Sequence, residues 1–423
     1  MTQDALSAVE RRALSQVDPD ALLADLDTIV SVRSVDGDET TIQPVVAALM
    51  TAHGLRPHLW SIDMAAVRKH EHFSAEVERR EAAGLVGELG GGDGRSLMFN
   101  AHVDVVPPGD VSLWTHDPWR ATLVNGNVYG RGALDDKGGL VCALHAAGAI
   151  ARAGVRLSGR LIVASVIGEE DGGTGTLGTI LAGHVADAAV VVEPTALALV
   201  PAQAGALNFR LTVDGASAHG CVRAEGISAL EKFELLHDAL LRLEAQRNER
   251  VTDPLFASYA LPIPLNIGTV RAGEWPSSVP ERLVCEGRYG VAVGEDPAAA
   301  RAEFTAAVNT AASADPWLAE HRPLVEWWGG QFHPASTSTD ERIVATVAES
   351  HLATAGQAPL VEGVTYGADM RLLTNVAHMP TVLYGPGDVR RSHRPDECVP
   401  LAEMLTATRT LIVTALRFCG HFT

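Results

Sequence analysis

Three apolar stretches in the first half of the chain, with a helical segment between the first two, predict a sheet of parallel strands. Residues 96–100, 160–167 and 188–192 are apolar with little alternation, which is typical of strands covered on both faces. Residues 138–152 have the pattern of a helix. A strand, a crossover helix and further strands in this order indicate a parallel βαβ arrangement.

Acidic and imidazole side chains follow these apolar runs or lie in the adjoining loops. In chain order they are His102, Asp104, Asp135, Glu169, Glu170, Glu193 and His393. An α/β sheet binds its ligands outside the carboxyl ends of its strands. We therefore expect these side chains to belong to one functional site.

The first three of these groups have the spacing of a metal site. His102 and Asp104 are two positions apart on an extended chain and point to one side. His102 can therefore bind a metal while the Asp104 carboxylate orients its ring. Asp135 lies in a turn flanked by Gly132 and Gly138, and its two oxygens can bridge two cations about 3.5–4 Å apart.

The later groups complete a set of nitrogen and oxygen donors. Glu169 and Glu170 are adjacent and point in different directions, so one can bind metal while the other holds a water proton. Glu193 follows a valine-rich strand, and His393 lies in a polar loop. Histidines and carboxylates without cysteine suit Zn²⁺, Co²⁺ or Mn²⁺ better than a metal that prefers thiolates.

Each group also has a structural explanation. A histidine such as His102 is more often hydrogen-bonded than metal-bound, and Asp135-Asp136 has the composition of a plain turn. Residues 169–171 would suit the acidic start of a helix. Taken singly these explanations are favoured. Taken together they are not, because five such sites fall at predicted strand ends or adjoining loops of one sheet.

The composition argues against several classes of partner. The chain of 423 residues has a formal net charge of −19, which would repel nucleic acid and anionic membranes. Its five cysteines are dispersed without paired spacing, which indicates a reducing compartment. The N-terminal residues lack a signal peptide, and no run approaches the roughly 20 apolar residues of a membrane span. We expect a cytoplasmic protein.

The pattern changes after Gly205, which predicts an inserted domain. A strand, a helix, two strands and a second helix follow in the order of a small α+β unit, at residues 207–213, 227–244, 265–270, 283–291 and 297–312. We expect a catalytic domain of residues 1–205 and 324–423, interrupted by an α+β domain of residues 206–323. The charged stretch of residues 63–83 is predicted to be a surface insertion with some helix, and the sequence assigns it no role.

The motifs resemble those of a family of metallopeptidases and deacylases that includes acetylornithine deacetylase, succinyl-diaminopimelate desuccinylase, aminoacylase and glutamate carboxypeptidase. The matching motifs are His-x-Asp at 102–104, Gly-Arg-Gly-x-x-Asp-x-Lys-Gly at 130–138, Glu-Glu at 169–170, Glu-Pro at 193–194 and the late His393. They occur in the family's order and cover nearly the whole chain. The resemblance implies an α/β catalytic domain with a mixed, mostly parallel sheet flanked by helices, as in di-zinc peptidases, and an inserted domain that acts as a lid and forms a dimer.

The resemblance also implies a role for each motif. One metal would be held by His102 and Glu193, the other by Glu170 and His393, with Asp135 bridging them, Asp104 orienting His102 and Glu169 acting as general base. The peptide bond between Asp135 and Asp136 is expected to be cis. The family's aminopeptidases tend to carry Asp where Glu193 stands, so Glu here resembles the deacylases and carboxypeptidases.

Three further residues are candidates for contact with substrate. By resemblance, His219 would reach across a dimer to the partner's active site and stabilise the oxyanion, although the sequence alone favours a turn histidine. Arg288 would grip the substrate carboxylate, the alternative being a surface salt bridge. Arg371 is a weaker candidate for the same work. Ser278 stands where many relatives have Asn before Val-Pro, which weakens the transfer of an asparagine contact there.

These observations predict an amidohydrolase with two divalent metal ions, zinc or alternatively cobalt or manganese. Its substrate would be a small N-acyl amino acid with a free carboxylate, cleaved at the amide rather than at an ester, and the enzyme would be a homodimer through the inserted domain. A dipeptidase or carboxypeptidase is the alternative within this class. A non-catalytic binding protein would have damaged ligands, and none is found. A hydrolase with a single zinc ion is a third possibility, which a count of metals per chain would decide.

Overall fold

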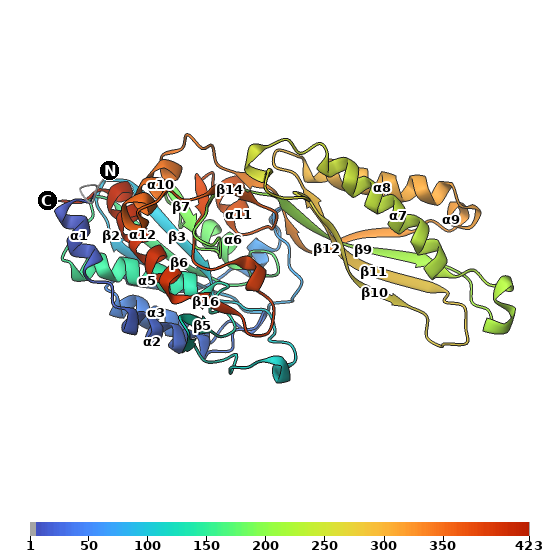
Figure 1. Cartoon of the computed structure of the whole chain (residues 1–423), viewed down its shortest axis with the longest axis horizontal. Helices are drawn as coiled ribbons and strands as arrows, with labels where there is room; N and C mark the ends of the chain where they lie inside the picture. The colour runs from blue at the N-terminus through green and yellow to red at the C-terminus, as the bar shows by residue number, and fades with distance from the viewer. Residues whose placement is uncertain (1–5, 423) are drawn as a thin grey trace. The chain divides into compact units, whose positions relative to one another are not determined.

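The structure is a computed structural model that describes residues 6–422, and it divides the chain into two compact units. Unit 1 comprises the chain up to Ala202, Ser336–Glu362 and the chain from Ala368 onward. Unit 2 comprises Gln203–Ala335 and Gly363–Gly367. Figure 1 shows the elements of both units.

A mixed sheet forms the centre of unit 1. The strand order is β1-β2-β6-β3-β7-β15-β8-β13, with β14 paired to β8. The strands β6, β3, β7 and β15 are parallel to one another, whereas β1, β2 and β8 pair antiparallel. The bounds are β1 Arg56–Ser61, β2 Ala83–Gly90, β3 Ser96–His102, β6 Arg160–Val166, β7 Ala188–Val191, β8 Leu199–Gln203, β13 Ala335–Ser336, β14 Val361–Val364 and β15 Thr381–Leu383. The predicted α/β class with a largely parallel central sheet is confirmed.

The uninterrupted apolar runs form the strands that are buried on both faces. Every residue of β7 is buried, and so is every residue of β3 and β6 after the first. The helices α5 and α12 pack on β3 and β6, and α6 packs on β2 and β6. Because α5 also packs against α2 and α12, it is buried on nearly all sides, which agrees with its almost continuous apolar sequence.

The helix predicted at residues 138–152 is observed as α5, and further helices occur along unit 1. Their bounds are α1 Ala8–Leu14, α2 Pro19–Val30, α3 Ile42–Ala52, α4 Met64–Val67, α5 Lys137–Arg152, α6 Thr174–Leu181, α10 Arg342–Ala355, α11 Met370–Asn375 and α12 Leu401–Cys419. A separate small sheet has the order β16-β5-β4, with bounds β4 Thr122–Val124, β5 Asn127–Tyr129 and β16 Cys398–Pro400. Among the described residues, no helix combines the length and apolar character needed to cross a membrane.

Unit 2 is an antiparallel sheet with helices packed on it. The strand order is β10-β11-β9-β12, and a single apolar core joins the sheet to α7 and α8. The bounds are β9 Gly205–Asp214, α7 Ala229–Asn248, β10 Leu265–Ala272, β11 Arg282–Val291, α8 Pro297–Ser313, α9 Pro316–Glu320 and β12 Leu324–Phe332. The interior residues of β9 alternate between buried and partly exposed, which is the pattern of a strand covered on one face.

Two expectations about this chain need correction. The inserted unit ends after Ala335 rather than at residue 323, because β12 pairs with β9 and so belongs to the sheet of unit 2. The charged stretch of residues 63–83 does contain a helix, α4, but it is not purely a surface insertion. Ser74 and Arg79 are buried, and Arg79 is only 3 % exposed.

Candidate metal centre

The parallel strands of unit 1 bring three of the predicted motifs to one edge of the sheet. His102 is the last residue of β3, Glu169 follows β6 and Glu193 follows β7. Because β6, β3 and β7 are parallel neighbours, their carboxyl ends lie side by side. Asp135 reaches the same place from the turn before α5, and His393 from the loop after the short 3₁₀ helix η5 (Val389–Arg391).

The imidazoles and carboxylates form a continuous chain of short contacts. His102 Nε2 lies 3.0 Å from Asp135 Oδ1, and His393 Nε2 lies 3.4 Å from Asp135 Oδ2. His393 Nε2 is also 3.0 Å from Glu170 Oε1. Each oxygen of Asp135 therefore faces a different imidazole. This is the arrangement expected of a carboxylate between two cation positions.

Two groups of potential ligands overlap at His102. The donor atoms of His102, Asp135 and Glu170 lie within 4.8 Å of one another, and so do those of His102, Asp136 and Glu193. All of these side chains except Glu170 are buried, and Glu170 is only partly exposed. The structure thus brings the five predicted ligands into one cluster. It also places Asp136, which was expected only to form a turn with Asp135, beside Glu193.

Unpaired carboxylate oxygens show that this donor set fits divalent cations. Glu169 Oε1 and Glu193 Oε1 are buried and have no hydrogen-bond partner among the described residues, and the same holds for both oxygens of Asp136. Burying a carboxylate without a partner is costly unless it gains a proton or a cation. Burial and the nearby Asp135 raise the pKa of Glu193 to about 8. A divalent ion would satisfy these oxygens and remove the need for protonation.

The neighbouring carboxylates also shift the pKa values of the two histidines. Burial lowers the pKa of His393, but contacts with Asp135 and Glu170 outweigh this and raise it to about 11. Burial likewise opposes protonation of His102, yet Asp104 and Asp135 raise its pKa well above the ordinary value. Asp135 shifts the other way: burial raises its pKa, and the two imidazoles more than offset this and hold it below its usual range.

Asp104 contacts the His102 ring mainly through its backbone. His102 Nδ1 lies 3.0 Å from the backbone oxygen of Asp104 and 3.7 Å from its Oδ1. The other carboxylate oxygen, Oδ2, accepts the backbone N–H of Glu170 at 3.0 Å. If Nδ1 carries the proton, the Nε2 lone pair is directed toward Asp135. Asp104 therefore contacts the ring and also ties the β3 end to the Glu170 loop.

The turn around Asp135 is held by Glu397, a residue that was not predicted to belong to the site. Glu397 Oε1 accepts backbone N–H groups of Gly132, Leu134 and Asp135 at 2.8, 3.2 and 3.3 Å, and its other oxygen pairs with Arg131. No sequence signal identifies this contact, because the partners are more than 260 positions apart. The Asp135–Asp136 peptide bond is cis, as the resemblance implies.

A third group of possible ligands, Asp25, His53 and His145, lies elsewhere in unit 1. Both imidazole Nε2 atoms lie 2.8 Å from the same oxygen of Asp25. Arg152 Nη1 faces the other ring nitrogen of His53 at 3.4 Å. A metal-bound imidazole normally donates its second N–H to an acceptor, and a guanidinium cannot accept. We therefore interpret this group as a hydrogen-bonded cluster that joins α2, α3 and α5.

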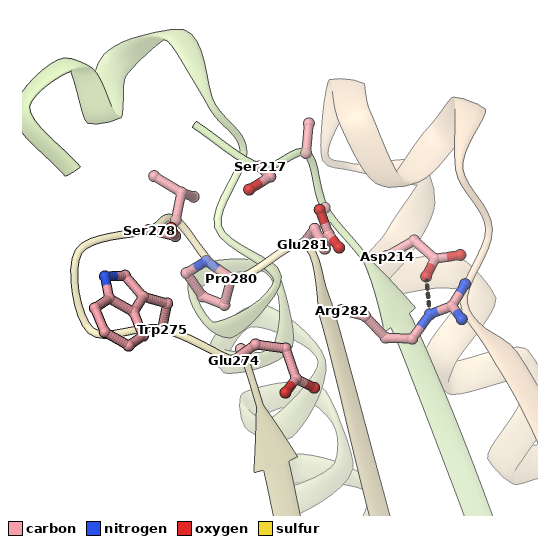
Figure 2. A pocket seen from close by; sticks show the side chains of 12 residues that line it. Asp214, Ser217, Glu274, Trp275, Ser278, Pro280, Glu281 and Arg282 are labelled. Carbon is pink, nitrogen blue, oxygen red and sulfur yellow. Dashed lines mark hydrogen bonds and ion pairs between the residues drawn. The ribbon is translucent and has the colours of Figure 1, made fainter. Parts of the chain in front are cut away.

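His219 lies in unit 2, and its bridge partner Ser278 lines a cavity of about 680 Å³. His219 Nδ1 accepts the backbone N–H of Cys221 at 3.2 Å, and its backbone bridges to Ser278. His219 is exposed, so its Nε2 is free to donate to a ligand. Figure 2 shows the cavity wall formed by Ser217 and by the loop that carries Trp275, Ser278 and Pro280.

The two predicted substrate-binding arginines have different surroundings. Arg288 lies on β11, donates to the backbone oxygen of Thr365 at 2.9 Å, and forms no ion pair with a carboxylate of the described chain. Burial lowers its pKa. Arg371 is fully buried in unit 1 and donates to the backbone oxygen of Gly172 at 2.6 Å. The hydrogen bond from Arg371 to Gly172 supports the loop that carries Glu169 and Glu170. A contact between Arg371 and substrate stays a prediction.

A mixed α/β unit with imidazoles and carboxylates converging at the carboxyl edge of its sheet, interrupted by an α+β unit, defines a class of metal-dependent hydrolases. The chain belongs to peptidase family M20/M25/M40, whose profile matches residues 98–417. It is therefore an enzyme that acts on C–N bonds of amides or peptides, as predicted. The family depends on a dinuclear metal centre.

Several known proteins are similar over most of the chain. An acetylornithine deacetylase from Myxococcus xanthus is 29% identical over 93% of this chain and 99% of its own length. An N-formyl-4-amino-5-aminomethyl-2-methylpyrimidine deformylase from Bacillus subtilis is 29% identical over 80% of this chain and 83% of its own length. The fold is shared with the dipeptidase Dug1p from Saccharomyces cerevisiae, with a TM-score of 0.77, 11% identity and 99% of each chain covered.

Proposed function

We propose that this enzyme is a deacylase that cleaves the amide bond of a small N-acyl amino acid with a free carboxylate. The observation that carries the proposal is the buried Glu169 Oε1, which has no hydrogen-bond partner among the described residues, together with the contact chain of His102, Asp135, His393 and Glu170. Two relatives with 29% identity are named for removing acetyl and formyl groups, which favours removal of a small acyl group over cleavage between two amino acids.

We infer that two divalent ions, zinc or alternatively cobalt or manganese, are held by five side chains. His102 and Glu193 would hold one ion, Glu170 and His393 the other, and Asp135 would bridge them. Such a centre supplies an acidified water and polarises the substrate carbonyl. Asp104 keeps the His102 ring oriented through its backbone and carboxylate oxygens.

Glu169 is the proposed general base. Its Oε1 is buried beside the proposed ligands and has no hydrogen-bond partner among the described residues, so it can take a proton from water. The same carboxyl group then delivers that proton to the leaving amine. Glu169 Oε1 can carry the proton in both steps because it makes no hydrogen bond with any described residue.

Two residues of unit 2 are proposed to bind the substrate. Arg288 would hold the free carboxylate, since its planar fork matches two carboxylate oxygens and no acidic side chain of residues 6–422 forms an ion pair with it. His219, from a partner subunit of a homodimer formed through unit 2, would donate its Nε2–H to the oxyanion. A cytoplasmic location is part of the same proposal.

The test compares substrates and counts metals. Purified enzyme is assayed with N-acetyl, N-formyl and N-succinyl amino acids and, in parallel, with dipeptides. Higher kcat/KM on the N-acyl compounds supports a deacylase, whereas higher values on dipeptides would show that the dipeptidase alternative is right. Metal content is measured before and after chelation. Full activity in a metal-free preparation would end the two-metal mechanism, and one ion per chain would favour the single-zinc alternative.

A further inference from the structure

The buried Arg79 connects the charged stretch of residues 63–83 to buried carboxylates of unit 1. Its Nη1 donates to both carboxylate oxygens of Asp171 at 2.7 Å. Its Nε donates to Glu39 Oε1 at 3.0 Å, and its Nη2 lies 3.3 Å from Asp36 Oδ1. One guanidinium is therefore shared by three carboxylates from two segments of unit 1, residues 36–39 and the loop that carries Asp171. A buried cation in such a position offsets their mutual repulsion.

Asp171 connects this ion cluster to the loop that carries the proposed base. It follows Glu169 and Glu170 directly in the sequence. Its Oδ2 also accepts the backbone N–H groups of Glu76 and Val77, at 3.2 and 2.9 Å. The loop is thus attached to the charged stretch through one side chain, by a guanidinium and by two backbone amides.

Two glycines allow the stretch to approach this closely. A Cβ atom on Gly168 would lie 2.9 Å from Arg79 Cζ, and one on Gly172 would lie 2.2 Å from the backbone oxygen of Ser74. Both glycines have positive φ, +64° and +140°, which other residues rarely adopt. The backbone on both sides of the Glu169–Glu170 pair is therefore shaped to receive residues 74–79.

The other two carboxylates belong to a segment that is bound to the end of β3. Val35 and Val105 form a parallel bridge, and the Val105 N–H donates to the backbone oxygen of Ser34 at 2.9 Å. The Ser34 hydroxyl donates to the backbone oxygen of Val103. Asp36 and Glu39 follow directly, so Arg79 links the His102-x-Asp104 motif to the loop after β6.

We propose that Arg79 is a positioning residue that sets the distance between the two loops of the metal centre. One loop carries His102 and Asp104 and the other carries Glu169 and Glu170, and the inference rests on the function proposed above for these residues. Only the guanidinium can satisfy three carboxylates in separate directions at once. A lysine at position 79 would keep the charge but lose the fork.

The test uses the full chain with Arg79→Met and Arg79→Lys. Arg80→Met is the matched control, since Arg80 is the next residue and is exposed. Three quantities are measured: hydrogen exchange of residues 168–173 in metal-free protein, zinc affinity by competition with a chromophoric chelator, and kcat and KM on the best substrate of the panel. Residues that support metal ligands typically change metal affinity or activity by about 10- to 100-fold.

We expect Arg79→Met to exchange faster in the loop and to lose about 10- to 100-fold in zinc affinity and kcat, with KM changed much less. Arg79→Lys should lie between it and the control. A purely stabilising role would lower the melting temperature and leave zinc affinity and kcat of the folded protein unchanged. Loop exchange and zinc affinity within about twofold of the Arg80→Met values would overturn the proposal.

A second variant keeps the test decisive if Arg79→Met does not fold. Asp171→Asn retains an oxygen for the Glu76 and Val77 amides and removes only the charge that pairs with Arg79. We expect it to show the same pattern with smaller changes, and unchanged exchange and zinc affinity would overturn the proposal. If the wild-type enzyme hydrolyses no amide, the proposed function fails, while exchange and zinc affinity still decide the role of Arg79.

Discussion

Replacing Glu397 by Gln removes one charge from a buried pair while keeping the shape of the side chain. The side chains of Arg131 and Glu397 are 2 % and 1 % exposed. Loss of one partner of a buried ion pair costs about 3–5 kcal/mol, because the other charge stays buried and unpaired. Gln keeps an oxygen for the amides of the Asp135 turn, so we expect the lower end, about 3 kcal/mol, in Glu397→Gln.

Ala at the same position should cost more. Glu397→Ala also leaves the three amide groups of Gly132, Leu134 and Asp135 without their acceptor. Each such loss adds about 1 kcal/mol. The total for Glu397→Ala should therefore exceed that for Glu397→Gln by about 2–3 kcal/mol.

Urea unfolding followed by circular dichroism measures these differences as free energies of unfolding. The control is Arg120→Met, which breaks the pair of Arg120 with Asp27; the Arg120 side chain is 62 % exposed, so about 0–1 kcal/mol is expected. Zinc affinity should also fall in Glu397→Gln, since the turn that carries Asp135 loses its support. If Glu397→Gln unfolds within about 0.5 kcal/mol of wild type, the reasoning about the buried pair is wrong.

Three further predictions concern the base, the pH dependence of stability and the substrate. Glu169→Gln should lower kcat about 10²- to 10⁴-fold with metal content unchanged, and steady-state kinetics that retain a tenth of wild-type kcat would exclude it as general base. Burial raises the pKa of Asp25, but hydrogen bonds with His145 and His53 more than offset this and hold it below the ordinary value. Because the pKa of Asp25 is lower in the folded than in the unfolded state, the ionised carboxylate stabilises the fold above the unfolded pKa of about 4, and this contribution is lost as pH falls below that value. Wild type and Asp25→Asn should therefore differ in urea midpoint at pH 6 and converge at low pH. Arg288→Ala should raise KM for substrates with a free carboxylate, and equal losses on the corresponding amides would show that it does not bind that group.

The sequence predicted the elements that depend on local pattern. The strands β3, β6 and β7 can be recognised in the sequence, because strands buried on both faces need continuous apolar residues. The candidate ligands could be placed at strand ends because they directly follow these recognisable strands in the sequence. The antiparallel edge strand β1 was missed, since most of its residues are exposed and carry no such signal.

The inserted unit shows where local pattern fails. The strand β12 lies in residues 324–423, which were assigned to the catalytic domain, but it belongs to unit 2. Its membership depends on pairing with β9, more than 110 positions earlier, and pairing partners leave no mark in a single strand's composition.

The sequence alone determined the chemical type of the site, because the donor atoms and their order along the chain are properties of the residues themselves. Only the tertiary structure decided how those donors are supported. Arg79 and Glu397 look like ordinary surface charges in the sequence, yet each is buried against carboxylates or amides far away in the chain. A charge in the core is stable only where the fold supplies its partners, and that condition depends on distances in space rather than on neighbours in sequence.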